Sequence, residues 1–295
     1  MSLRAELLRI GLRWFVKRRI GNVDDLRRSV DAITPYIPAP SRRTKTAPMD
    51  IAGVRTHSIV TPAFENDRHI LYLHGGAYVS GSPSFYRDLT WRIAKRARAR
   101  VLCVDYRLAP EFPFPAAVND ATLVYRWLIH NGVDPRRIAI VGDSAGGGLA
   151  FATLLKLRDE GMPMPAATVA LSPWTDLALT GMSLELNAET ESILSIGATR
   201  RLAEHYLAGA DPRTPYASPL YGDLAGLPPT LIQVGSDEAQ LDDSVRMADK
   251  LRATGCEVEL EIWPRMPHAW QLFTRLLPEA RQAIERIGIF LKARM

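Results

Sequence analysis

Residues 138–148 read Ile138-Ala-Ile-Val-Gly-Asp-Ser-Ala-Gly-Gly-Gly148, which is a short apolar run, then Gly-x-Ser-x-Gly, then the start of a helical pattern. This pattern predicts a serine held at a sharp turn between a strand and a helix. Gly142 and Gly146 leave the room that such a turn needs, because neither carries a side chain. The following helix would direct its amino-terminal amides toward the place where a negatively charged oxygen forms. Ser144 is therefore the candidate nucleophile, although Gly-x-Ser-x-Gly alone is a weak signal.

The overall composition is that of an ordinary soluble protein. Of the 295 residues, 47% are hydrophobic and 23% are charged, which suits one large α/β domain with insertions. The net charge of +5 comes largely from the first twenty residues, so nucleic-acid binding is not expected. That segment has no apolar run of signal-peptide or membrane-spanning length. We therefore expect a cytoplasmic protein without stable membrane insertion.

The cysteines and histidines argue against disulfides and metal sites. Cys103 lies inside an apolar strand pattern and Cys256 at the start of another, as reduced thiols do. The six histidines are scattered, and no Cys/His cluster has metal-ligand spacing. We therefore expect no metal site.

From Val54 onward, strand signals alternate with helix signals. Strands are predicted at 70–73, 101–104, 168–171, 231–234 and 258–262 and in the apolar run before Ser144, and helices at 85–98, 116–130, 243–254 and 278–293. This alternation predicts an α/β fold in which helices cover both faces of a mostly parallel central sheet.

Two segments fall outside this alternation. Residues 1 to about 40 carry two amphipathic helical patterns, broken at Gly21-Asn22 and ended by prolines. We expect them to lie on the domain as a lid, in preference to the alternative of a membrane-surface helix. Residues of about 175–220 are a candidate insertion over the strand ends, with one helical pattern at 199–207. The prediction is a single domain, 1–295, with these two additions.

A glycine-rich loop and a histidine follow two of the predicted strands. The loop is His74-Gly75-Gly76-Ala77-Tyr78, whose adjacent glycines let backbone amides converge on a developing negative oxygen. His74 is interpreted as a brace for this loop rather than as a base. The candidate base is His268, which follows the strand at 258–262 through a short loop stiffened by two prolines. Active sites of parallel sheets gather at these strand ends.

The carboxylate that orients the base should follow the strand at 231–234. There the chain reads Gly235-Ser-Asp-Glu-Ala-Gln-Leu-Asp-Asp243. Asp242 and Asp243 are interpreted as the amino-terminal cap of the next helix. Asp237 and Glu238 remain as candidates for the acid. With either one, the order nucleophile, acid, base is that of an α/β-hydrolase triad.

Several motifs together resemble those of the bacterial hormone-sensitive-lipase-like esterases, in their Gly-Asp-Ser-Ala-Gly subgroup, over residues 70–293. They are His74-Gly-Gly-Ala77, Asp105-Tyr-Arg-Leu-Ala-Pro-Glu111, Pro113-Phe-Pro-Ala-Ala117, Gly142-Asp-Ser-Ala-Gly146, Ser172-Pro-Trp174 and Met266-Pro-His268. The resemblance implies an α/β-hydrolase fold with a helical cap, carboxylic ester hydrolysis without a cofactor, and often a homodimer.

The resemblance also assigns roles to the glycine-rich loop. It implies that the amides of Gly76, Ala77 and Ala145 form the oxyanion hole, with Gly75 shaping the loop. The family loop usually reads His-Gly-Gly-Gly-Trp, whereas alanine and tyrosine occupy the last two places here. An alanine amide still donates, so we expect oxyanion stabilisation to survive, with a backbone angle at Ala77 that is not one reserved for glycine. The resemblance further implies that Asp143, Arg107 and Glu111 are structural, and Trp174 and Trp270 are candidate pocket or packing residues.

The choice between Asp237 and Glu238 as the triad carboxylate rests on the register of the family motif. This motif is usually Asp-Pro-Leu-x-Asp followed by an Ala-x-x-Leu helix. A gapless alignment on Ala248 and Leu251 places Glu238, not Asp237, in the acid position.

The leading prediction is a serine carboxylesterase that hydrolyses short-chain, small-molecule esters through an acyl-enzyme, with Ser144, Glu238 and His268 as its triad. One alternative is an amide or formamide hydrolase on the same triad. Another is a non-catalytic ligand-binding receptor, which the presence of the histidine disfavours.

Overall fold

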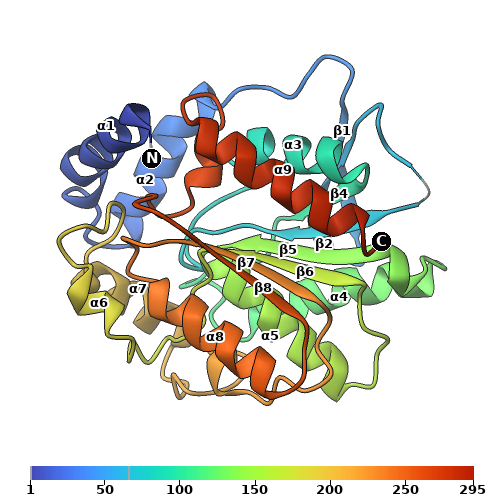
Figure 1. Cartoon of the computed structure of the whole chain (residues 1–295). Coiled ribbons are helices and arrows are strands. Elements are labelled where there is room, and N and C mark those ends of the chain that lie inside the picture. The colour runs from blue at the N-terminus through green and yellow to red at the C-terminus, as the bar shows by residue number, and fades with distance from the viewer. Residues whose placement is uncertain (1, 66) are drawn as a thin grey trace.

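The computed structural model describes residues 2–65 and 67–295, and the strands in this part of the chain form one eight-stranded sheet. Its spatial order is β1-β2-β4-β3-β5-β6-β7-β8 (Figure 1). The bounds are β1 Lys45–Ile51, β2 Val54–Val60, β3 His69–Leu73, β4 Arg100–Val104, β5 Ile138–Asp143, β6 Ala167–Leu171, β7 Thr230–Gly235 and β8 Val258–Trp263. Only β1 with β2 and β2 with β4 pair antiparallel. The prediction of a mostly parallel sheet is confirmed.

Helices cover both faces of the sheet, as predicted (Figure 1). One face carries α3 (Arg87–Ala97) and α9 (Pro278–Lys292), and the other carries α4 (Ala116–His130), α5 (Ala145–Asp159) and α8 (Leu241–Ala253). Alternate residues of β3 enter the two cores. Ile70 and Tyr72 pack in the α3 and α9 core, whereas Leu71 and Leu73 pack in the α4 and α5 core. A strand buried on both faces needs this continuous apolar run.

The strand β1 was not predicted, because it lacks the sequence signals of a strand. It contains Pro48, most of its side chains are exposed, and it pairs only with β2 at the edge of the sheet. Edge strands tolerate proline and polar residues because one side needs no hydrogen-bonding partner. Its pairing with β2 is therefore set by the neighbouring strand rather than by its own apolar pattern.

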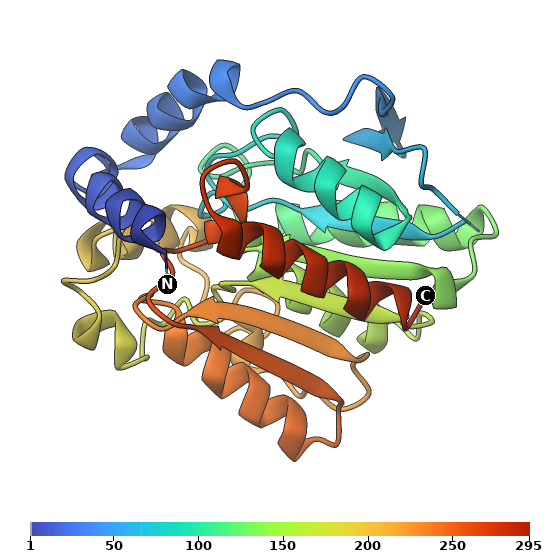
Figure 2. The same ribbon diagram turned by 45° about the horizontal axis from the view of Figure 1, so that its top comes forward.

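The N-terminal helices and the first part of the 175–220 segment lie together near the carboxyl ends of the parallel strands (Figures 1 and 2). The last part of that segment instead contacts the carboxyl-terminal halves of α5 and α8, through Tyr216 and Leu220. The first group comprises α1 (Leu3–Leu12), the π-helix η1 (Arg13–Lys17), α2 (Val23–Ile33) and η2 (Thr34–Tyr36). The second comprises α6 (Ser183–Leu186), α7 (Ile196–Leu207) and η4 (Pro219–Tyr221), and two further 3₁₀ turns are η3 (Pro135–Arg137) and η5 (Trp270–Phe273). Arg27 of α2 binds both carboxylate oxygens of Glu111 and so ties the N-terminal helices to the domain. Within the described residues, no helix combines the length and apolar character needed to cross a membrane.

Candidate active site

Ser144 occupies the sharp turn between β5 and α5. Its backbone angles are φ 53° and ψ −122°, a conformation that costs free energy for a residue with a side chain and is typical of functional sites. A Cβ atom on Gly142 would lie 2.1 Å from the carbonyl oxygen of Gly146. One on Gly146 would lie 2.0 Å from the carbonyl oxygen of Leu73. Both glycines are therefore required for the strand, the turn and the neighbouring strand to approach so closely.

Three side chains from separate strand ends form one hydrogen-bonded line. The hydroxyl of Ser144 lies 2.8 Å from Nε2 of His268, and Nδ1 of this ring lies 2.7 Å from Oε2 of Glu238. Glu238 is fully buried, and its other oxygen accepts hydrogen bonds from the Ser172 hydroxyl and the Gly235 amide. Because both oxygens are engaged, the carboxylate has one fixed orientation toward the imidazole.

Asp237, the competing candidate acid, makes a different contact. Its carboxylate binds the guanidinium of Arg9, which α1 brings to this loop and which is itself buried. The loop after β7 turns tightly, with the amide of Glu238 donating to the carbonyl of Gly235. A Cβ on Gly235 would lie 2.2 Å from the carbonyl oxygen of Met266, so this glycine lets the acid loop and the histidine loop touch. The alignment that selected Glu238 agrees with this geometry.

The buried pair of Glu238 and His268 shifts the pKa of both side chains. Burial raises the pKa of Glu238, and the hydrogen bond from His268 opposes that rise. Burial alone would lower the pKa of His268, but the hydrogen bond and the charge of Glu238 outweigh it and raise the pKa to about 9. The carboxylate therefore favours the protonated form of the imidazole.

The glycine-rich loop after β3 places several amides beside Ser144. The amide of Gly75 donates to Oδ1 of Asp143 at 2.9 Å, so it holds the loop and is not available to a substrate. The amides of Gly76, Ala77 and Ala145 have no hydrogen-bond acceptor among the described residues. Asp143 also accepts hydrogen bonds from two tyrosine hydroxyls, those of Tyr72 and Tyr86. It is thus a brace for the loop, as expected.

The loop residues that depart from the family pattern adopt left-handed backbone angles. Ala77 has φ 53° and Tyr78 has φ 63°. The left-handed region is open to alanine at a cost of about 1–2 kcal/mol, so alanine is tolerated here although glycine would fit with less strain. Gly76 differs, because its φ is 118° and a Cβ there would lie 2.1 Å from the carbonyl oxygen of Ser80. The replacement of the third glycine thus leaves the loop in a conformation that still exposes its amides.

His74 braces this loop and does not reach the nucleophile. Its ring stacks between those of Tyr106 and Tyr86, with centroids 4.3 and 5.5 Å away. Burial lowers its pKa to about 4, so the ring is neutral near pH 7 and its Nδ1 donates to the carbonyl of Gly75 at 2.8 Å. The imidazole of His74 therefore holds the loop through a backbone carbonyl, not through the glycine amides.

Comparisons with known proteins identify the family of this chain. The sequence model of the alpha/beta hydrolase fold family matches residues 70–272. The chain also superimposes on a crystal structure of an esterase from the bacterial hormone-sensitive lipase family, at a TM-score of 0.94 and 44% identity, covering 100% of this chain and 99% of that chain. This chain belongs to the bacterial hormone-sensitive lipase family. It is accordingly a carboxylesterase.

Other relatives carry similar names. An acetyl-hydrolase of Streptomyces hygroscopicus is 50% identical over 240 residues, which span 81% of this chain and 80% of that protein. An esterase of Acinetobacter venetianus is 40% identical over 244 residues, spanning 82% and 80%. EstE5, in a crystal structure soaked with p-nitrophenyl butyrate, is 39% identical to this chain with a TM-score of 0.94, covering 100% of this chain and 99% of that one.

Some buried carboxylates of this esterase have roles that the sequence did not indicate. Asp243 does not cap α8, which begins at Leu241 without a side-chain cap. Its carboxylate instead accepts hydrogen bonds from the amides of Thr175 and Asp176, and burial raises its pKa to about 7. Asp242 likewise accepts from the amide of Ser183. The predicted capping role is therefore wrong, because both carboxylates hold the segment that follows β6.

Glu191 is a buried carboxylate that sequence reasoning missed. It accepts hydrogen bonds from the amides of Ser192 and Ile193 at 2.6 and 2.7 Å, and from Ala239 at 3.0 Å. Ala239 directly follows Glu238, so this carboxylate joins the 175–220 segment to the acid loop. No motif or periodicity marks it, because its partners are backbone amides distant in sequence.

An apolar cavity of about 230 Å³ contains Ser144 and His268. Its walls come largely from the N-terminal helices and from η5. The apolar lining includes Leu12, Val16, Ile20, Leu26, Val30, Phe85, Leu89, Ile193, Leu194, Leu272 and Phe273. Trp174 and Trp270 are both buried in the cores, as packing residues are.

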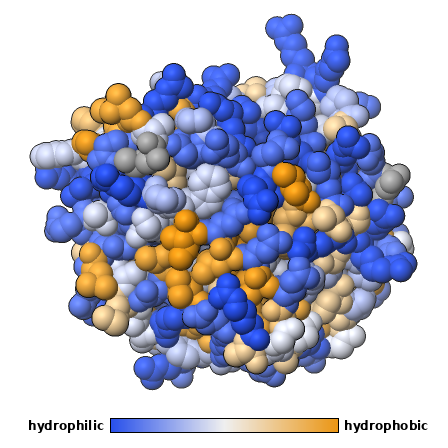
Figure 3. Space-filling model, in the orientation of Figure 1, coloured by the Kyte–Doolittle hydropathy of each residue, from blue (hydrophilic) through white to orange (hydrophobic). Residues whose placement is uncertain are grey.

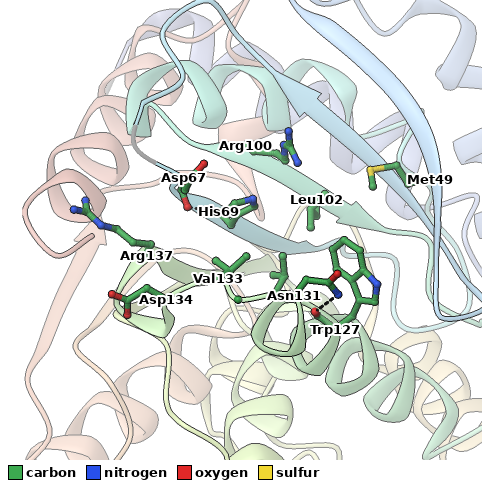
Figure 4. Close-up of a pocket in the computed structure, with 12 residues that line it drawn as sticks. Met49, Asp67, His69, Arg100, Leu102, Trp127, Asn131, Val133, Asp134 and Arg137 are labelled. Carbon is green, nitrogen blue, oxygen red and sulfur yellow. Dashed lines mark hydrogen bonds between the residues drawn. The ribbon is translucent and has the colours of Figure 1, made fainter.

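A larger cavity, of about 850 Å³, opens at the other end of the sheet. Figure 4 shows side chains such as His69, Arg100 and Trp127 around it. His69 and Arg100 begin β3 and β4, whereas the hydrogen-bonded line of Ser144 follows the carboxyl ends of the strands. The larger of these two cavities is therefore not the one that contains the candidate nucleophile and its partners.

Proposed function

We propose that this esterase hydrolyses short-chain carboxylic esters through an acyl-enzyme on Ser144. The observation that carries the proposal is the line from Ser144 through His268 to Glu238, with contacts of 2.8 and 2.7 Å. A serine hydroxyl is a weak nucleophile unless a base within hydrogen-bond reach removes its proton. This line supplies the base and the carboxylate that orients it.

The reaction proceeds in two steps. Oγ of Ser144 attacks the ester carbonyl carbon while Nε2 of His268 takes its proton, and the imidazolium then protonates the departing alcohol. The acyl group stays on the serine. A water molecule, deprotonated by the same nitrogen, attacks the acyl carbon, and the carboxylic acid leaves as the proton returns to Ser144. The net change is one ester and one water to one acid and one alcohol.

Three free amides favour the negatively charged intermediate. We assign the oxyanion hole to the backbone N–H groups of Gly76, Ala77 and Ala145, while Gly75 shapes the loop through its bond to Asp143. The amide of Ala145 also lies at the amino terminus of α5, where the helix dipole is positive. One such donor typically contributes about a hundredfold to a thousandfold in turnover.

The size of the cavity supports small substrates. Its volume of about 230 Å³ is below the usual range of pockets for drug-sized ligands, and its lining is mainly apolar. The N-terminal helices form much of the wall, and we propose that they act as the cap of the site together with the 175–220 segment. The butyrate ester soaked into the related EstE5 is of the same substrate class.

The test is a series of p-nitrophenyl esters from acetate through butyrate and octanoate to laurate, with kcat/KM measured for each. The expected result is a maximum at the short chains and a steep fall toward laurate. Ser144→Ala should lower kcat by about a million-fold without unfolding the protein, because the loss of a triad nucleophile leaves only catalysis by the oxyanion hole and by substrate binding. A Ser144→Ala variant with a few per cent of the activity would exclude the mechanism. A rise in kcat/KM toward laurate would exclude the assignment of short chains.

We further propose a cytoplasmic homodimer. Cys103 and Cys256 are free thiols, which suits a reducing compartment. β8 is an edge strand with half-buried or exposed side chains along its length, and such an edge can pair with a second copy. Light scattering of the purified chain tests the dimer, and a concentration-independent monomer would exclude it.

A further inference from the structure

The first helical segment carries its apolar residues on the outside of the molecule. The side chains of Leu3, Leu7, Ile10 and Trp14 are 76, 62, 43 and 56% exposed, and the neighbouring Phe15 is 67% exposed. The first four are spaced i, i+4, i+7 and i+11, which places them in one stripe along α1 and η1. We call these five residues the outer stripe. Figure 3 shows a hydrophobic patch at the upper left, where Figure 1 places α1.

The inner face of the same helix holds ion pairs beside its apolar residues Ala5 and Leu8. Arg9 is buried, and its guanidinium binds Asp237 and the carboxylate of Glu6. Glu6 in turn binds Arg265 at 3.2 Å. A surface helix usually buries its apolar side and exposes its charges. Because this helix also exposes apolar residues, folding leaves the outer stripe in contact with water, and such patches mark interaction sites.

The segment that carries the outer stripe is itself basic. Arg4, Arg18 and Arg19 are exposed, and the guanidinium of Arg18 lies 3.6 Å from the ring centroid of Trp14. Between residues 3 and 19 the only acidic residue is Glu6, which is already paired on the inner face. A second copy docked through the same stripe would bring like charges together. An apolar stripe rimmed by arginines instead complements a surface with negative headgroups over an apolar layer.

We propose that the outer stripe docks this esterase on phospholipid bilayers that contain anionic lipids. Leu3, Leu7 and Ile10 would enter the boundary between headgroups and acyl chains, and Trp14 suits the interface because its ring is apolar with one polar edge. The inner side of the same segment forms part of the catalytic cavity through Leu12 and Val16. Docking therefore places the cap between the bilayer and the cavity. The proposal needs only these surface residues and holds whatever ester the site hydrolyses.

Cosedimentation with vesicles tests the proposal on the full chain. The vesicles are phosphatidylcholine alone, or phosphatidylcholine mixed with phosphatidylglycerol, at low and at high salt. The test variant is Leu7→Gln/Trp14→Gln. The matched control is Leu123→Gln/Ile289→Gln, which changes two exposed apolar residues on α4 and α9. A third variant, Arg18→Gln/Arg19→Gln, removes two charges but no apolar group.

The wild type and the control should sediment with the mixed vesicles and much less with phosphatidylcholine. The stripe variant should bind at least about tenfold more weakly for each apolar group removed. The arginine variant should bind about fivefold more weakly per charge and lose most of its sensitivity to salt. All variants should hydrolyse p-nitrophenyl butyrate in solution at the wild-type rate, and Ser144→Ala should bind vesicles normally.

Three outcomes would overturn the proposal. One is equal binding of the wild type to both vesicle types, and another is no binding to either. The third is a dimer in solution that Leu7→Gln/Trp14→Gln converts to a monomer, because the stripe would then cover a second copy of the chain. Failure of the vesicle test together with normal ester hydrolysis would leave the proposed function intact.

Discussion

Replacement of Glu238 by glutamine tests the assignment of the acid, because it removes one charge and hardly changes the shape. The hydroxyl of Ser172 accepts a hydrogen bond from the amide of Ala269, so it uses its own proton as donor to Oε1 of Glu238. The amide of Gly235 donates to the same oxygen. In Glu238→Gln the side-chain carbonyl must therefore take this place. Its NH₂ group is then left facing Nδ1 of His268.

This orientation of the glutamine determines the expected loss in kcat. An NH₂ group opposite Nδ1 requires that nitrogen to accept, which places the ring proton on Nε2, toward Ser144. A base with its proton on that nitrogen cannot take the serine proton. The same fault in a comparable serine triad costs about ten-thousand-fold in kcat, equivalent to about 5 kcal/mol of transition-state stabilisation. Asp237→Asn should cost less than tenfold by comparison, because that carboxylate contacts Arg9 and not the ring.

The assay is kcat on p-nitrophenyl butyrate for both variants, with thermal unfolding as a check that each is folded. Glu238→Asp is a useful third variant. It keeps the charge but is one methylene too short for the 2.7 Å contact, so its kcat should lie between those of the wild type and Glu238→Gln. A crippled Asp237→Asn beside a nearly normal Glu238→Gln would refute the reasoning, because the acid would then be the preceding residue.

Three other perturbations follow from the geometry. Glu238 raises the pKa of His268 toward 9, and the ring must be neutral to act as a base. The value of kcat/KM should therefore rise with pH through a midpoint above 6.5, and activity should be lost as the pH falls below that midpoint. A midpoint at or below 6.5 would contradict the coupling between Glu238 and His268. Gly146→Ala should destabilise the fold by about 3 kcal/mol or more in denaturant unfolding, because its Cβ would meet a backbone carbonyl; wild-type stability would show that the strands can separate. Arg9→Met should cost about 2 kcal/mol of stability, because it leaves the largely buried Asp237 unpaired, and Arg9→Lys should restore part of the loss; equal unfolding midpoints would show that the ion pair contributes nothing.

The strands that carry the reactive residues could be predicted from the sequence, because their apolar runs alternate with helical patterns and each run ends at a polar loop. The same patterns identified Ser144 and His268 as candidates. The choice between Asp237 and Glu238 needed the register of a known family motif. Neither periodicity nor composition can assign different roles to two adjacent carboxylates. Their different roles depend on the tight turn after β7 and on Arg9, the partner that α1 contributes to Asp237.

Roles that depend on distant backbone groups could not be predicted. Asp243 stands at the start of a helix, where a cap is the reasonable interpretation, yet its acceptor atoms serve amides from a loop more than sixty residues earlier. Glu191 lies in an irregular segment, and its three donors carry no sequence signal because any residue has a backbone N–H. The edge strand β1 likewise depends on β2 for its conformation.

The orientation of α1 follows from the two loops that it touches. Asp237 directly precedes Glu238 and Arg265 lies three residues before His268, and both charged side chains face α1 through their pairs with Arg9 and Glu6. Asp237 is largely buried and a buried charge needs a partner, so the inner side of this helix must supply a cation, which is Arg9. The inner side therefore combines ionic and apolar residues, whereas Leu3, Leu7 and Ile10 lie outside. Sequence periodicity does not show which side of the segment meets the domain, whereas the ion pairs with these two loops do. For this reason a change in the outer stripe should alter docking alone, while a change at Arg9 should reach the loop that holds Glu238.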